Sequence, residues 1–296
     1  METRTEKYKN EFRKIVLEEN KKRTKKILSI IIPIIVLIFI WGKFISVNIL
    51  KSNYFSITDS NIPSSFENYK IVQFSDFHFN KYNNERKLEK VINKINSYEP
   101  DIIIFNGDLI DKDYKPSNKE YKLITNFLKK LKKDALKYSV IGDEDFYNDN
   151  YDNIMYDSGI KLLKNNYDIV YRNDNNPILI YGLDSSLKGN PNIDLINKKN
   201  VNNIAYKIIL VHEPDYASEI AEGAGDLILS AHSMYGQIKL PLIKPLHLPK
   251  GAREYYNKEN EVNSTKLYIT GGCGQKKYNF RLFTLPSINV YNLNSK

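Results

Sequence analysis

An almost wholly apolar run of twenty-one residues, Ile27 to Val47, constrains the fold of this chain more than any other feature. A helix needs about 20 apolar residues to cross the hydrocarbon core of a bilayer. Lys43 lies near the far end of the run, where its long side chain can reach the membrane interface. A cleaved signal peptide is the alternative interpretation, but a long tail precedes the run and no small-x-small cleavage site follows it. The run therefore predicts a transmembrane anchor at residues 27–47.

The tail before this anchor, residues 1–26, is strongly basic. It has ten Lys or Arg against five Glu and so holds +5 of the formal net charge of +9. Only Lys43 and Lys51 lie close to the other end of the span, so the positive-inside rule places the amino terminus in the cytoplasm. The tail is either a topology signal alone or also a contact for anionic lipid. We expect a single-pass protein of the cell membrane, with the bilayer as partner and the main domain extracytoplasmic.

The rest of the chain divides into a predicted linker, residues 48–66, and one folded domain, residues 67–296. The linker has turn residues, Pro63 and no clear hydrophobic period. The domain begins as a β-α-β-α-β progression, which is typical of an α/β fold. Its second half is richer in strands, and residues 147–157 are expected to form a surface loop. The predicted strands are Lys70–Phe74, Asp101–Phe105, Tyr138–Ile141, Ile178–Tyr181, Lys207–Val211, Leu227–Ser230, Lys266–Ile269 and Ser287–Tyr291.

Residue types that bind metals follow five of these strands directly. Parallel strands gather such residues at one edge of a sheet, so side chains scattered along the sequence can meet in one cleft. The single cysteine, Cys273, excludes a multi-thiolate site, and any transition metal must be held by histidines and carboxylates. The sequence therefore predicts a polynuclear metal site. The residues concerned are Asp76, His78, Asp108, Asp143, His212 and His232.

Each motif taken alone has a simpler explanation. An Asp-x-His such as Asp76-Phe77-His78 is usually a surface or capping pair, and an aspartate after a strand, such as Asp108, is a common helix N-cap. His212 and His232 carry more weight, because the chain has only four histidines and these two both end apolar strands. Nucleic-acid binding is not expected, since the tyrosines that could stack on bases are dispersed along the chain.

In this order the residues resemble the calcineurin-like metallophosphoesterases, from about Lys70 to the carboxyl terminus. The family pattern is D-x-H, G-D-x-x-D, G-N-H-D or G-N-H-E, a lone His, and G-H-x-H. The flanking residues of the last two motifs look most like a bacterial membrane-associated branch. The corresponding stretches here are Asp76 to His78, Gly107 to Asp111, Gly142 to Asp145, His212, and Ala231 to Met234.

The resemblance implies a four-layer α-β-β-α sandwich, preceded here by the transmembrane helix, and a two-metal site that hydrolyses a phosphoric ester or pyrophosphate. By the resemblance, Asp76 and His78 hold the first metal, and Asp108 bridges the two metals and takes part in catalysis. Asp143, His212 and His232 hold the second metal. The cofactors are then one or two divalent ions, Mn, Zn or Fe, and a phosphorylated cell-envelope compound is a candidate substrate.

Three of the predicted site positions depart from the family pattern. Asp143 replaces an Asn, Glu144 replaces a histidine that contacts phosphate, and Met234 replaces the last histidine of the first metal site. A thioether is a poor ligand for the ions used in hydrolysis, so the first site is expected to be weak. Cys273 is a hypothetical substitute ligand for Met234. Glu144 is the candidate catalytic acid, and it needs a raised pKa to donate a proton.

The four carboxylates Asp76, Asp108, Asp143 and Glu144 cancel the charge of two divalent ions completely. With one ion, two negative charges remain and repel phosphate. We therefore expect a membrane-anchored phosphoesterase of reduced or altered activity. The alternative is a catalytically inactive pseudoenzyme that acts as a binding or scaffold module.

Overall fold

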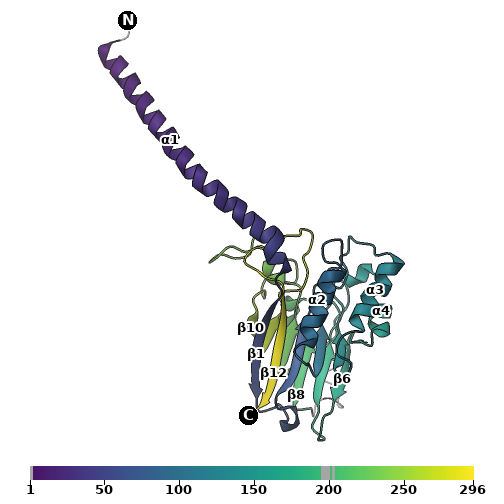
Figure 1. Cartoon of the computed structure of the whole chain (residues 1–296). Helices are drawn as coiled ribbons and strands as arrows, with labels where there is room; N and C mark the ends of the chain where they lie inside the picture. The colour runs from purple at the N-terminus through teal and green to yellow at the C-terminus, as the bar shows by residue number, and fades with distance from the viewer. Residues whose placement is uncertain (1–2, 195–200, 202–203) are drawn as a thin grey trace.

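The computed structural model describes residues 3–194, 201 and 204–296. Figure 1 shows one long helix, α1, that projects from a domain built of strands and shorter helices. The helices are α1 (Arg4–Ile40), α2 (Glu85–Asn96), α3 (Asn118–Leu128) and α4 (Tyr151–Asp157). The strands are β1 (Lys51–Asp59), β2 (Tyr69–Phe74), β3 (Ile102–Phe105), β4 (Leu136–Ser139), β5 (Lys161–Leu162), β6 (Asn166–Val170), β7 (Ile178–Gly182), β8 (Tyr206–Leu210), β9 (Leu227–Ser230), β10 (Glu259–Val262), β11 (Thr265–Ile269) and β12 (Ser287–Ser295).

The predicted tail and anchor form one continuous helix. A capping box between Thr3 and Glu6 begins α1, and a π-helical turn (Trp41–Ile45) and a 3₁₀ turn (Ser46–Asn48) extend it to the domain. No side chain of α1 is buried, although residues 27–40 are all Ile, Leu, Val or Phe except Ser29 and Pro33. The helical segment Arg4–Asn48 is long and apolar enough to cross a membrane.

The domain contains two six-stranded mixed sheets. The first has the strand order β1-β12-β2-β3-β4-β5, and the second has the order β10-β11-β9-β8-β7-β6. In the first, β2 to β5 are parallel and β12 is antiparallel to β2. In the second, β7, β8, β9 and β11 are parallel, while β6 and β10 run in the opposite direction. The predicted α/β class is confirmed.

Three apolar cores separate the layers of the domain. One lies between the two sheets and includes Ile104 and Ile208. Another lies between the first sheet and helices α2 to α4, where Phe74 packs near Leu88. The last covers the outer face of the second sheet, where the described residues contribute a 3₁₀ helix (Pro214–Glu219) and loops. The predicted sandwich thus has its two sheets and one α-helical layer, and the described part of its fourth layer has no α-helix.

Two segments differ from their predictions. Within the predicted linker, residues 51–59 form β1, an edge strand that pairs in parallel with β12. An edge strand buries few side chains, here Asn53 and Ile57, and this sparse pattern resembles a loop in sequence. The loop expected at residues 147–157 contains α4, whose buried Tyr151, Ile154 and Met155 follow helical spacing.

The topology places the anchor and the predicted metal ligands at one edge of the first sheet. β1 begins three residues after the helical segment ends, and it runs parallel to β12. Because β12 is antiparallel to β2, the amino end of β1 lies beside the carboxyl ends of β2, β3 and β4. Figure 1 shows α1 meeting the domain at this edge.

Candidate metal centre

Two loops at this edge hold Asp76, His78 and Asp108 close together. The main-chain N–H of Asp76 donates to the carbonyl of Gly107 at 3.0 Å, and that of His78 donates to the carbonyl of Asp108 at 3.1 Å. Gly107 has φ +83°, and a Cβ there would lie 2.4 Å from the nitrogen of Gly142. Only glycine lets the loops after β3 and β4 approach this closely.

The six predicted ligands converge into two groups that share Asp108. We call Asp76, His78 and Asp108 the first half-site, and Asp108, Asp143, His212 and His232 the second half-site. Within each, one ligand atom from every residue lies within 4.8 Å of all the others.

Distances within each half-site suit bound cations. His78 Nε2 lies 3.8 Å from both Asp76 Oδ1 and Asp108 Oδ2. His212 Nε2 lies 3.3 Å from Asp108 Oδ2, and His232 Nδ1 lies 3.2 Å from Asp143 Oδ1. The structure therefore brings together all six residues that the sequence marked.

Buried polar atoms at the centre of this cluster make no hydrogen bond. They are Asp76 Oδ1, His78 Nε2 and Asp108 Oδ2, which face one another. Buried polar atoms in proteins nearly always have a partner, so these three have the character of ligand atoms. The oxygen and nitrogen donors present fit manganese, zinc or iron.

Each of the three histidines is held through its other ring nitrogen. His212 Nδ1 contacts the carbonyl of Asn106, and His232 Nε2 lies 2.8 Å from the carbonyl of Lys250. His78 Nδ1 lies 3.1 Å from Glu144 Oε2. Such contacts fix the ring orientation and the tautomer of metal-binding histidines, and they leave the opposite nitrogen pointing into the cluster.

The backbone is strained at four of the predicted ligands. Asp76, His78, Asp108 and His232 have φ values of 47°, 47°, 59° and 63°, in the left-handed region that few non-glycine residues occupy. Such strain costs about 1–3 kcal/mol per residue and concentrates at functional sites. The surrounding hydrogen bonds hold these four residues in place against this cost.

Glu144 does not have the environment of an acid catalyst. It is 1% exposed, and its Oε1 lies 2.6 Å from Lys276 Nζ. Its Oε2 accepts from the main-chain N–H of Lys112 at 3.1 Å, besides contacting His78. Burial alone would raise the pKa of Glu144, but His78 and Lys276 outweigh burial and hold that pKa well below its usual value. The carboxylate therefore orients His78 and pairs with Lys276.

Lys276 is the site residue that the sequence analysis missed. Gln237 fixes its backbone, since Lys276 N donates to Gln237 Oε1 at 2.9 Å and Gln237 Nε2 donates to Lys276 O at 3.1 Å. Burial would lower the pKa of Lys276, but Asp108, Glu144 and Asp143 raise it, which keeps the ammonium charged. The available sequence signal was a glycine-rich turn, Gly271 to Gly274, followed by Gln275 and two lysines.

The carboxylates shift the pKa values of two ligand histidines upward. Burial would lower the pKa of His78, but Glu144 outweighs burial and raises it to about 9. Burial likewise opposes the charge of His212, and Asp108 raises the pKa of that residue well above its ordinary value. Burial opposes ionisation of Asp108 and Asp143 too, but the nearby histidines lower the pKa of both carboxyls. The cluster thus attracts positive charge strongly.

The first half-site has no fourth ligand among the described residues. Met234 lines the adjoining cavity in a left-handed conformation, with φ 45°. The Cys273 thiol belongs to neither ligand group within the described part of the chain, and its sulfur lies 4.0 Å from the carbonyl of Ser287. Burial raises the pKa of this thiol to about 12. The structure therefore does not support Cys273 as a substitute ligand.

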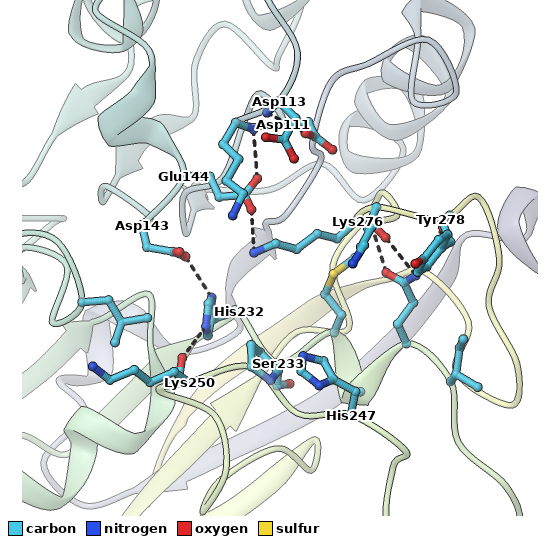
Figure 2. A pocket seen from close by; sticks show the side chains of 18 of the residues that line it. Asp111, Asp113, Asp143, Glu144, His232, Ser233, His247, Lys250, Lys276 and Tyr278 are labelled. Atoms are coloured by element: carbon cyan, nitrogen blue, oxygen red, sulfur yellow. Dashed lines mark hydrogen bonds and ion pairs between the residues drawn. The ribbon is translucent and has the colours of Figure 1, made fainter.

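A cavity of about 620 Å³ opens beside the two half-sites. Figure 2 shows Asp143, Glu144 and His232 on one part of its wall, with the Lys276 side chain reaching towards Glu144. His247, which matched no ligand position in the sequence, also lines this cavity. The cavity can hold a phosphorylated compound next to the cluster.

The family assignment follows from the sequence match together with this site. Residues 69–236, more than half of the chain, match the model of the calcineurin-like phosphoesterases. The chain belongs to this family.

Relatives of known name agree with the assignment. The chain is 30% identical to the uncharacterized metallophosphoesterase YkuE of Bacillus subtilis, over 86% of this chain and 89% of YkuE. It is 26% identical to the UDP-2,3-diacylglucosamine pyrophosphatase LpxG of Chlamydia muridarum, over 89% of this chain and 95% of LpxG. It is also 24% identical to a transmembrane protein with metallophosphoesterase domain of Danio rerio, over 72% of this chain and 50% of that protein.

Proposed function

We propose that this protein is a membrane-anchored, metal-dependent phosphoesterase that hydrolyses a phosphoric ester or pyrophosphate with water. The observation that carries the proposal is the pair of half-sites around Asp108. Four of their buried ligand atoms, Asp76 Oδ1, His78 Nε2, Asp108 Oδ2 and Asp143 Oδ1, lack hydrogen bonds, and their histidines are oriented through the opposite ring nitrogen. The first half-site would hold one divalent cation and the second half-site another. Bound cations would polarise the phosphoryl group and activate water as the nucleophile.

Lys276 supplies positive charge that the sequence analysis did not count. Together with Asp76, Asp108, Asp143 and Glu144 it leaves three net negative charges in the centre. Two divalent cations turn this sum to plus one, and a single cation leaves minus one. With both cations the centre would attract a phosphate anion, and Lys276 is positioned at the cavity wall to contact its oxygens. We propose reduced or altered activity, because Met234 and Glu144 replace two histidines of the family pattern.

The anchor would remain attached to the mature protein. Gly42, Ser46 and Val47, at the end of the apolar run, are buried against the domain, so cleavage within or after this stretch would remove packed residues. The basic tail would lie in the cytoplasm and the domain on the opposite side. A phosphorylated cell-envelope compound is then an accessible substrate. The activity for which LpxG is named, that of a pyrophosphatase, is of the same chemical kind.

A second candidate function is that of an inactive binding module which retains one cation. The exchange of two family histidines for Glu144 and Met234, with Glu144 paired to Lys276, favours it. It predicts a folded, cation-binding protein without hydrolytic activity.

The deciding experiment uses the full chain in nanodiscs, loaded with Mn²⁺ or Zn²⁺ and assayed with bis(p-nitrophenyl) phosphate and p-nitrophenyl pyrophosphate. Asp108→Asn should lower kcat by at least about 10²-fold, the loss typical when one preorganised electrostatic group is removed. Asp149→Asn, at an exposed position outside the cavity, serves as the matched control. Hydrolysis that is absent, or that survives Asp108→Asn, would contradict the enzyme proposal.

A further inference from the structure

The end of the membrane anchor is joined directly to a segment beside the catalytic cavity. The N–H of Arg281 donates to the carbonyl of Gly42 at 3.0 Å, and Gln275 Nε2 donates to the carbonyl of Val47 at 3.1 Å. The ring of Phe280 lies 5.7 Å from that of Phe39, between centroids. These contacts fix residues 275–283 against the point where the helix enters the domain.

A second segment continues from the first towards the cavity. The N–H of Lys239 donates to the carbonyl of Leu282 at 3.0 Å, and the N–H of Leu246 donates to the carbonyl of Ile238 at 3.2 Å. We call residues 238–247 and 277–283 the rim. Ile238, Leu246 and Tyr278 of the rim line the cavity itself. The green to yellow loops in Figure 1 lie beside the base of α1, as these contacts require.

The rim exposes an unusual number of large apolar side chains. Leu242 is fully exposed, and five others in the rim are more than one third exposed. Single exposed apolar residues are common on soluble proteins, but a cluster of them marks an interaction surface. The residues are Leu240, Leu242, Ile243, Leu246, Tyr278 and Phe283.

Basic residues accompany these apolar side chains, and acidic ones do not. Lys239, Lys244 and Lys277 lie within the rim. The sequence has no Asp or Glu between Leu227 and Arg253, nor anywhere after Glu261. Apolar side chains combined with lysines are the chemistry of surfaces that enter the interface of an anionic bilayer.

We propose that the rim lies in the interface of the membrane that α1 crosses, so that the cavity opens towards anionic lipid head groups and receives its substrate from the bilayer. The rim shares hydrogen bonds and ring contacts with the end of the anchor, so it cannot move far from the bilayer surface that α1 leaves. The statement about substrate rests on the proposed function, whereas the contact between rim and bilayer does not.

The test places a fluorophore on the rim of the full chain. Leu242→Cys, labelled with an environment-sensitive nitrobenzoxadiazole, is reconstituted in nanodiscs of phosphatidylcholine and phosphatidylglycerol that contain doxyl-labelled lipid. Cys273 is 4% exposed, and the unlabelled background is measured with the unsubstituted chain. Tyr171→Cys is the matched control. Tyr171 is 61% exposed and follows β6, whose carboxyl end lies at the edge of the second sheet opposite to the one that carries His212 and His232.

We expect the doxyl lipid to quench the label at position 242 by about twofold or more, as for a side chain within the interface, and to leave the label at position 171 unchanged. Equal quenching at the two positions would overturn the proposal. Lys244→Gln combined with Lys277→Gln should reduce the quenching only in discs that contain phosphatidylglycerol. Quenching that does not depend on phosphatidylglycerol would overturn the role of anionic head groups.

This readout does not require hydrolysis. If the chain hydrolyses the chromogenic substrates through Asp108 but shows no quenching at position 242, only the proposed contact between the rim and the bilayer is refuted. Quenching in a chain without hydrolytic activity would refute the proposed function alone.

Discussion

The two half-sites of this protein differ in their number of predicted ligands and in the groups that orient their histidines. The second half-site takes its ligands from the ends of four strands, and main-chain carbonyls orient both of its histidines. The first half-site has three ligands, and its histidine is oriented by Glu144, a side chain that also pairs with Lys276. Main-chain carbonyls survive substitution, whereas a carboxylate held by a lysine does not. Because Asp108 belongs to both groups, we expect the second half-site to keep its cation affinity even where the first half-site has lost a ligand.

The largest effect is expected when one predicted ligand is removed from either half-site and the metal content of the two variants is compared. Asp143→Ala should weaken cation binding at the second half-site by more than about 100-fold, since even the residues that orient metal ligands contribute about 10–100-fold to metal affinity. His78→Ala should leave that ion in place. Elemental mass spectrometry after dialysis against limited manganese measures both. Equal loss of metal in the two variants would contradict the prediction that the second half-site binds its cation more tightly than the first.

Adding a ligand to the first half-site should bring its cation affinity closer to that of the second half-site. Met234→His places an imidazole at the wall of the cavity, at the position where the family pattern has the last histidine of the first metal site. Met234 has a left-handed conformation, which histidine tolerates better than most residues. We expect a second ion to bind about 10–100-fold more tightly, and hydrolysis to rise with it. Met234→Leu fills the same space without a ligand and serves as control. An increase in both variants would point to packing instead of coordination.

Removal of the Lys276 charge should affect the substrate more than the metal. Lys276→Gln should raise KM for the chromogenic phosphodiester by about 10–100-fold, the value of a hydrogen bond to a charged group. Metal content should stay unchanged or increase, because an ammonium that competes for the carboxylates is gone. Lys276→Arg keeps the charge and should restore most of the affinity. An unchanged KM in Lys276→Gln would exclude substrate contact.

The smallest effect is expected from Glu144→Gln. The amide keeps the shape of the side chain but weakens its hold on His78 Nδ1 and on Lys276. We expect about 10-fold weaker cation binding at the first half-site and no change at the second. A manganese titration that measures the affinity and the stoichiometry of each binding phase distinguishes the two half-sites. If activity increases in place of cation loss, the negative charge of Glu144 is what limits phosphate binding.

The sequence by itself determined the strand ends and the six residues that are predicted as metal ligands, because short apolar runs followed by Asp or His are local patterns. It also determined the apolar helix, whose composition allows few other environments. These features depend on residues close together in the chain.

Only the tertiary structure decided what lies around them. The pairing of Lys51 with Ser287 turned a predicted linker into β1 and placed the end of the apolar helical segment at the edge that carries the predicted metal ligands. Contacts between Lys276 and Glu144 and between Arg281 and Gly42 join residues more than one hundred positions apart. No local pattern encodes such pairs, because their partners are selected by how the two sheets pack and by which loops meet at one edge.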